Sequence, residues 1–279
     1  MKKFFARLYL IFIFILLYAP IAVLIAFSFN NSKTRAKWGG FTLKWYTSMF
    51  QDATIMQALA NTLIIALLSA LISTVLGLTA CICLSSMGRK RRMVIMNIID
   101  IPMQNAEIVT GISLMLIFIA FGQFLSRWGY TVKFGFETVL IGHITFNLPY
   151  TVLSIWPKLR QTNLSVFEAA QDLGATKSQA FFKVVLPDIM GGVLSGFMLA
   201  FTLSLDDFVI THFTKGPGFD TLSTKIYTEV RKGIKPQMYA LSTLLFLSVL
   251  LLLLFFGRDR SKGGAKGERK PSLLERMVP

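Results

Sequence analysis

The chain has 279 residues, of which 54% are hydrophobic and 15% charged, and its mean hydropathy is +0.60. A soluble domain carries about a quarter charged residues, and several apolar blocks here reach the roughly 18 residues that a bilayer-spanning helix needs. We therefore predict an all-α integral membrane protein. The net charge of +15 does not indicate a nucleic-acid partner, because the basic residues flank the apolar blocks.

The apolar blocks predict six transmembrane helices. In chain order they are Leu8–Phe29, Ala58–Met87, Met93–Phe121, Phe136–Trp156, Ile189–Phe213 and Met238–Phe256. The first block is too long for a secretory signal and lacks a small-x-small cleavage site, so we expect an uncleaved span. Residues 1–257 are expected to form one six-span domain, and residues 258–279 a basic, disordered cytoplasmic tail.

Lysine and arginine positions predict the orientation. An even number of spans places both termini on one side of the membrane. Of the 29 basic residues, 18 lie on the side of the termini and 11 on the opposite side. The strongest local signal is the run of four cations from Arg89 to Arg92, in a short loop. Because cytoplasmic loops are enriched in Lys and Arg, we expect both termini to be cytoplasmic.

The longest well-patterned polar stretch, Leu159–Pro187, separates the fourth and fifth predicted spans and is therefore expected in the cytoplasm. It is typical of a helix, a turn and a second short helix. Gly174 permits the left-handed conformation that ends a helix, and Pro187 is expected to close the second helix. Gly174–Ser178 lacks the Gly-Lys-Ser/Thr sequence of a phosphate loop, so we do not expect ATP to bind by that route.

The spacing within this stretch resembles the EAA loop of ABC-importer permeases. Glu168-Ala169-Ala170 is followed after three residues by Gly174, and later by Leu186-Pro187, with Val184 where isoleucine is commoner. Other segments are similar to spermidine/putrescine permease subunits of that family, particularly the second of the paired permeases. These segments are Phe41–Tyr46, Glu107–Leu114, His143–Phe146 and Phe201–Phe208. The similarity extends over the six-span core.

The resemblance implies a type I ABC importer permease fold in the bacterial inner membrane, with cytoplasmic coupling helices. It implies that the EAA loop docks on an ATPase through residues Glu168, Ala169, Ala170, Asp172, Gly174, Leu186 and Pro187. The implied partners are a homologous permease, a dimeric ABC ATPase, an extracytoplasmic polyamine-binding protein and membrane lipid. ATP and Mg²⁺ would be bound by the ATPase, so this chain is expected to hold no catalytic residue, cofactor or metal.

Four carboxylates fall inside predicted spans, namely Asp100, Glu107, Asp206 and Asp207. Inserting each near a helix centre costs about 2.5–3.5 kcal/mol, so such groups normally face a bundle interior or an aqueous path. A polyamine carries its own ammonium groups, and carboxylates along its route would offset the cost of removing their water. The resemblance points to the positions of Glu107 and of Asp206/Asp207 as the polyamine path.

Helical geometry separates the four acids. Asp100 and Glu107 fall on one stripe of the third predicted span, whereas Asp206 and Asp207 lie about 100° apart around the fifth. Which of the two aspartates faces the path stays open, the other being expected to contact a neighbouring helix. For Asp100, next to Pro102, capping of a broken helix or pairing with a buried cation is the favoured alternative. His143 is expected to be a hydrogen-bonded interior histidine.

Two other functions are weighed against polyamine import. An importer of an anion, a metal or another small nutrient would be indicated by cationic residues within the spans, which are scarce in this chain. A self-contained channel would need no ATPase, and the ordered cytoplasmic element argues against it.

Overall fold

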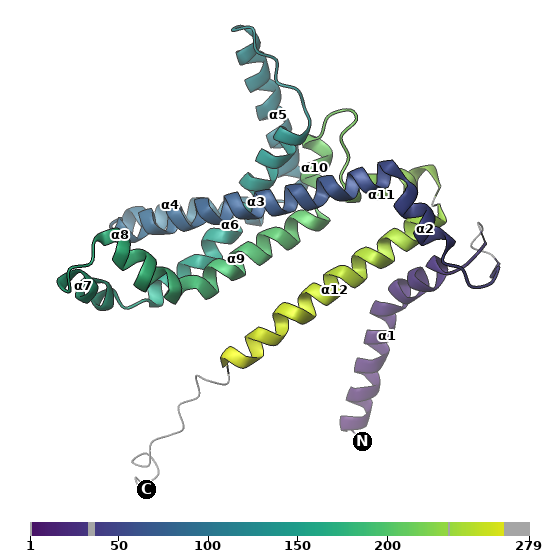
Figure 1. The fold of residues 1–279 in the computed structure, drawn as a ribbon, viewed down its shortest axis with the longest axis horizontal. Coiled ribbons are helices and arrows are strands. Elements are labelled where there is room, and N and C mark those ends of the chain that lie inside the picture. Colours follow the sequence, from purple (N-terminus) through teal and green to yellow (C-terminus); the bar gives the residue numbers. More distant parts are fainter. Residues whose placement is uncertain (1, 33–36, 234, 265–279) are drawn as a thin grey trace. The chain divides into compact units, whose positions relative to one another are not determined.

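The computed structural model describes residues 2–32, 37–233 and 235–264, which form helices without a named β-strand (Figure 1). An isolated antiparallel bridge joins Asn30 and Phe41. The helices are α1 (Lys2–Ser28), α2 (Lys44–Gln51), α3 (Ala53–Ser86), α4 (Arg89–Gln104), α5 (Glu107–Ser126), α6 (Phe136–Gln161), α7 (Leu164–Asp172), α8 (Lys177–Ala180), the π-helical turn η1 (Phe181–Val185), α9 (Leu186–Asp206), α10 (Val209–Thr214), α11 (Leu222–Lys232) and α12 (Pro236–Gly264).

Five of the described helices are long and apolar enough to cross a membrane. They are Phe5–Ser28, Ala53–Ser86, Glu107–Ser126, Phe136–Gln161 and Lys177–Asp206. The sixth predicted span, Met238–Phe256, falls within α12. This helix continues to Gly264, so the first residues of the predicted tail are helical, and residues 265–279 lie outside the described part of the chain.

The chain divides into two compact units, and the expected six-span domain over residues 1–257 stays a prediction. The first unit comprises Met1–Asp52 together with Glu229–Pro279, and the second is Ala53–Thr228. In the first unit, α1, α2 and α12 pack together. The Phe27 and Tyr239 rings lie 6.2 Å apart, and Gln237 donates a hydrogen bond to Ser48.

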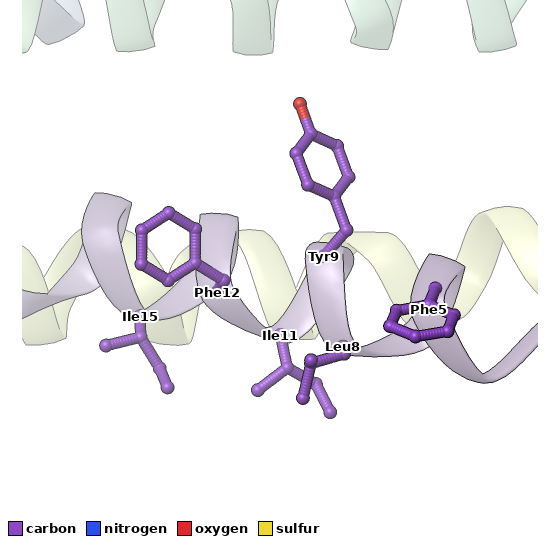
Figure 2. Close-up of a pocket in the computed structure, with 6 residues that line it drawn as sticks. All are labelled: Phe5, Leu8, Tyr9, Ile11, Phe12 and Ile15. Atoms are coloured by element: carbon purple, nitrogen blue, oxygen red, sulfur yellow. The ribbon is translucent and has the colours of Figure 1, made fainter.

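The N-terminal half of α1 exposes apolar side chains around its surface. Figure 2 shows a hollow on this helix lined by Phe5, Leu8, Tyr9, Ile11, Phe12 and Ile15. All six side chains are more than half exposed. An apolar surface of this kind on a helix long enough to span is typical of contact with lipid tails, and among the six lining residues only Tyr9 carries a polar side-chain group.

The second unit is built on α3, α6 and α9, which pack against one another through small and polar residues. The Ser69 and Ser204 hydroxyls lie 2.9 Å apart, and Asn147 Nδ2 donates to Ser204 Oγ at 2.7 Å. All three side chains are buried. Helices in a membrane associate through close packing at small residues and through interhelical hydrogen bonds, so this buried cluster joins one residue from each of the three helices.

The predicted start of the third span at Met93 is wrong. A helix does not run from Met93 to Phe121, because α4 ends at Gln104 and α5 begins at Glu107, with extended backbone at Asn105 and Ala106. Pro102 removes a backbone donor from the last turn of α4, which favours ending the helix there. The predicted stripe of Asp100 and Glu107 on one helix face is therefore also wrong.

The fifth predicted span is broken as well. Instead of one helix over Ile189–Phe213, α9 ends at Asp206, the backbone is extended at Asp207, and the short helix α10 begins at Val209. The following segment, expected to be a loop from Thr214 to Gln237, contains α11. Both breaks place carboxylates at helix ends, which sets the geometry of the candidate site.

Candidate functional site

The first candidate site is the cytoplasmic element predicted at Leu159–Pro187, which contains α7 and α8. The Asn163 side chain accepts a hydrogen bond from the Ser165 N–H at 3.0 Å and caps the start of α7. At the other end Gly174 has φ +90°. The Ala175 N–H bonds to the Ala170 carbonyl at 3.0 Å, and the Gly174 N–H bonds to the Gln171 carbonyl at 2.9 Å. These two bonds form a Schellman motif and confirm that Gly174 ends the helix.

The turn after Gly174 is fixed by a second capping arrangement. The Gln179 N–H donates to Thr176 Oγ1 at 3.3 Å, and the Thr176 N–H donates to Gln179 Oε1 at 3.0 Å. This reciprocal pair is a capping box, which satisfies two backbone donors at the start of α8. The chain between α7 and α8 is therefore held by hydrogen bonds at both ends.

Pro187 does not close the second helix, contrary to the prediction. Helices α8, η1 and α9 follow one another without a break, so that Lys177–Asp206 is a single helical segment of 30 residues. Leu186 and Pro187 lie in the first turn of α9. The π-helical turn just before them pairs the Leu186 N–H with the Phe181 carbonyl. This register shift accommodates the proline, which lacks an N–H of its own.

The surface of α7 presents both charge and apolar area to solvent. Glu168, Ala169 and Asp172 are exposed, and Ala170 is half-buried. Leu173, at the end of the helix, is 90% exposed, and Val166 is 51% exposed. Val166 and Leu173 are seven residues apart and so add exposed apolar area to the same side of α7. Leu173 was not identified from the sequence. Its position directly before the glycine that ends the helix was the one sequence feature that could have indicated its exposure.

The second candidate site is the break between α9 and α10. The Asp207 carboxylate accepts hydrogen bonds from the Ile210 N–H at 3.1 Å, the Thr211 N–H at 2.8 Å and Thr211 Oγ1 at 2.9 Å. His143 Nε2 lies 3.3 Å from the same carboxylate and 2.9 Å from Thr211 Oγ1. The side chains of His143 and Asp207 are only 2% and 4% exposed. The expected interior role of His143 is thus confirmed, and Asp207 caps the start of α10.

Two glycines allow α10 to approach its neighbours. A Cβ on Gly111 of α5 would lie 2.8 Å from the Phe213 ring, and a Cβ on Gly142 of α6 would lie 3.1 Å from Ile210. Any larger side chain at either position would push α10 away. These contacts, together with Thr211, fix the Asp207 region in place, and sequence patterns did not reveal them because their partners lie on other helices.

The remaining three acids lie on three different helices. Asp206 is the last residue of α9 and is exposed, while Glu107 is exposed in the first turn of α5. Asp100 is half-buried on α4. The described residues contain no group of three or more His, Cys, Asp or Glu that could hold a metal ion.

Comparison with known proteins gives consistent matches. Residues 71–260 match the family described as binding-protein-dependent transport system inner membrane component. The chain is 38% identical over 237 residues to the putrescine transport system permease protein PotI of Escherichia coli (strain K12), covering 85% of this chain and 83% of that protein. It is 34% identical over 254 residues to the spermidine/putrescine transport system permease protein PotC of the same strain, covering 90% and 93%.

Solved structures show the same fold at lower sequence identity. A chain of a bacterial ABC transporter that imports the acidic polysaccharide alginate superposes with a TM-score of 0.73 at 20% identity, over 94% of this chain and 95% of that one. A chain of an amino acid ABC transporter superposes with a TM-score of 0.52 at 18% identity, over 78% of this chain and all of that one.

Proposed function

The chain belongs to the family of binding-protein-dependent transport system inner membrane components, and from that membership we propose that it is the permease subunit of an ATP-driven polyamine importer. It is a multi-pass membrane protein with the type I ABC importer permease fold. The observation that carries the proposal is the similarity to two polyamine permeases over at least 83% of both chains. The partners would be a homologous permease, a dimeric ATPase and an extracytoplasmic polyamine-binding protein.

The α7–α8 element would dock on the ATPase from the cytoplasmic side, with both chain termini on that side as well. Its double capping makes it a rigid projection, and rigid surfaces lose less entropy on binding. Glu168 and Asp172, one turn apart on α7, offer negative charge to partner cations. Leu173 would fill an apolar pocket of the ATPase, as central apolar anchors do in protein interfaces.

Movement of the docked element would reach the membrane through α9. Because Lys177–Asp206 is one helical segment of 30 residues, it spans about 45 Å at about 1.5 Å per residue. Its first residues belong to the ATPase-docking element and its last residue is the exposed Asp206. A continuous helix transmits a displacement at one end to the other, so ATP-driven closure of the ATPases would alter the position of Asp206. ATP and Mg²⁺ would be bound by those partner ATPases.

The polyamine would contact Glu107 and Asp206. Both carboxylates are exposed in this chain, and an ionised group at membrane depth is stable only beside water, another protein surface or a counter-charge. The ammonium groups of a polyamine supply that counter-charge. Asp207 would act differently, since its oxygens are already occupied by Thr211 and His143. It would stabilise the break between α9 and α10, next to which Asp206 is exposed.

The fold by itself does not choose the cargo. A chain of the alginate importer has the same fold although its cargo is acidic. Preference for a cation over an anion therefore rests on the exposed acids and on the relatives' similarity. A self-contained channel is disfavoured because it leaves the exposed, rigid α7–α8 surface without a role.

Uptake of labelled putrescine and spermidine by proteoliposomes containing the assembled importer tests the proposal. ATP-dependent uptake that requires this chain, together with co-purification of an ATPase, is the expected result. Uptake of labelled anions or metal ions without uptake of either polyamine would contradict the cargo. Uptake without any ATPase would contradict the mechanism and favour a channel.

A further inference from the structure

A basic cavity lies between the beginning of α4 and the end of α6. Its volume is about 300 Å³, and its lining residues are Arg89, Arg92, Met93, Met96, Trp156 and Arg160. Its lining contains none of the exposed acids and no residue of α7 or α8, although Arg160 belongs to the Leu159–Pro187 stretch.

Helical spacing explains why these side chains meet. The four lining residues of α4 stand at positions i, i+3, i+4 and i+7, counted from Arg89, and so share one face of that helix. Trp156 and Arg160 stand one turn apart on α6. The two faces are joined by packing, because Met96 packs against the buried apolar cluster that contains Trp156.

Positive charge is concentrated here without a counter-charge. The Arg92 guanidinium lies 5.5 Å from the centre of the Trp156 ring. Within the described part of the chain, none of Arg89, Arg92 and Arg160 forms an ion pair with a carboxylate. The positive end of the α4 helix dipole lies at Arg89 and adds to the positive potential of the cavity. The first turn of α4 contains no acid that would reduce this potential. Guanidinium groups favour phosphate, which accepts paired hydrogen bonds.

Of the exposed apolar residues on α4, only Met93 lines the cavity, and it is 54% exposed. Val94, Ile98 and Ile101 are 54% to 58% exposed but lie roughly 80–140° further round the helix from Met93. A helix with basic residues at its start and exposed apolar residues further along is suited to the membrane interface. Trp156 ends the fourth predicted span, a position where tryptophan marks the membrane–water boundary.

We propose that this cavity binds the phosphate of an anionic phospholipid headgroup, with the beginning of the acyl chains against Met93 and Met96. A free phosphate would use the arginines but leave the exposed Met93 uncovered. A lipid uses both. Basic pockets at helix ends on the membrane surface bind anionic headgroups by the same chemistry.

The test is a titration of the full-length chain, purified in a neutral detergent, with dioctanoyl-phosphatidylglycerol, followed by native mass spectrometry. Dioctanoyl-phosphatidylcholine and inorganic phosphate serve as comparison probes. The variant pair R89Q/R92Q removes two lining charges. The control pair K90Q/R91Q removes the same charge from the same run, at residues that do not line the cavity. R160Q tests the α6 side independently, and thermal unfolding in detergent establishes that each variant is folded.

We expect phosphatidylglycerol to bind more tightly than phosphatidylcholine. We expect its affinity to fall about fivefold for each lining arginine removed, and to change little in K90Q/R91Q. Equal losses in both variant pairs would overturn the proposal, since they would indicate a general charge effect. Displacement of the lipid by inorganic phosphate at equal concentration would show that the cavity binds soluble anions, and this result would also overturn the proposal. Protection of Arg89 and Arg92 from chemical modification by an added ATPase, but not by lipid, would assign the cavity to a protein contact and also overturn the proposal.

Discussion

The carboxylate of Asp207 lies 3.3 Å from Nε2 of His143, with both side chains almost fully buried. The adjacent acid, Asp206, is exposed at the end of α9. Two neighbouring aspartates thus occupy opposite environments, because the helix ends between them. Asp207 satisfies the backbone of α10, whereas Asp206 retains its oxygens for another partner. This asymmetry gives a physical basis for separating stability from transport at adjacent positions.

Substitutions at these two positions should affect different quantities: the free energy of unfolding at Asp207, and polyamine uptake at Asp206. Asp207→Ala removes three hydrogen bonds at the start of α10, and we expect the free energy of unfolding to fall by about 2–4 kcal/mol. Asp207→Asn keeps a side-chain oxygen and should cost about 1 kcal/mol. Asp206→Asn should leave unfolding unchanged but reduce polyamine uptake by about tenfold, the effect of losing one contact of about 1.4 kcal/mol.

Reversible unfolding in mixed micelles and labelled putrescine uptake measure the two effects separately. Normal uptake in Asp206→Asn, combined with strong loss in a folded Asp207→Asn protein, would reverse the assignment of the two aspartates.

Charge reversal on α7 should uncouple transport from ATP hydrolysis. Glu168→Lys places a cation on the exposed surface of α7 that we propose docks on the ATPase, so we expect ATPase binding to weaken by at least tenfold while membrane insertion is unaffected. Glu137→Lys is the matched control, because Glu137 is also an exposed acid but lies at the start of α6, outside the α7–α8 element. Co-purification of the ATPase and polyamine uptake are the measurements. Equal effects of the two variants would argue against docking through α7.

Sequence patterns predicted most helices of this fold but not their breaks. The apolar blocks locate α1, α3, α6 and α12 well, because a bilayer demands long apolar helices. The block over Met93–Phe121 contains Asp100, Pro102 and Asn105, and a broken helix is the alternative favoured at Asp100, but these local signals do not locate the break at Asn105 and Ala106.

In the candidate sites too, features set by local sequence were predicted and features set by distant residues were not. Gly174 was predicted to end α7, since its conformation is a local property of the chain. The burial of Asp207 was not predicted, because it depends on His143, which is distant in sequence. Pro187 was misjudged for a related reason. The π-helical turn before it carries the helix past a residue that ordinarily ends one.

The left-handed backbone at Gly174 should make the docking element sensitive to a single methyl group. Gly174→Ala forces an L-residue to φ +90°, at a cost of about 1–2 kcal/mol. We expect the turn between α7 and α8 to loosen and ATPase affinity to fall by up to about tenfold. Gly88→Ala is the control, because Gly88 lies in a loop with open space around it and an ordinary φ of −61°. Hydrogen exchange of the Ala175 amide reports the loosening directly. Unchanged protection in Gly174→Ala would contradict it.

Close approach of α3 and α6 should make Gly77 intolerant of any side chain. A Cβ at Gly77 would lie 2.4 Å from Thr151 Oγ1, and this hydroxyl donates to the Ser73 carbonyl at 3.0 Å. The same hydroxyl also lies 2.8 Å from the Leu148 carbonyl of its own helix. Turning Thr151 away from a new side chain would break its bond to α3, so Gly77→Val should lower the free energy of unfolding by about 1–3 kcal/mol. Gly191→Val on α9 is the matched control, since a Cβ there meets no atom within 4 Å. Reversible unfolding in mixed micelles should separate the two variants. If they unfold alike, helix propensity rather than interhelical packing would explain the loss, and the close α3–α6 contact would not be a source of stability.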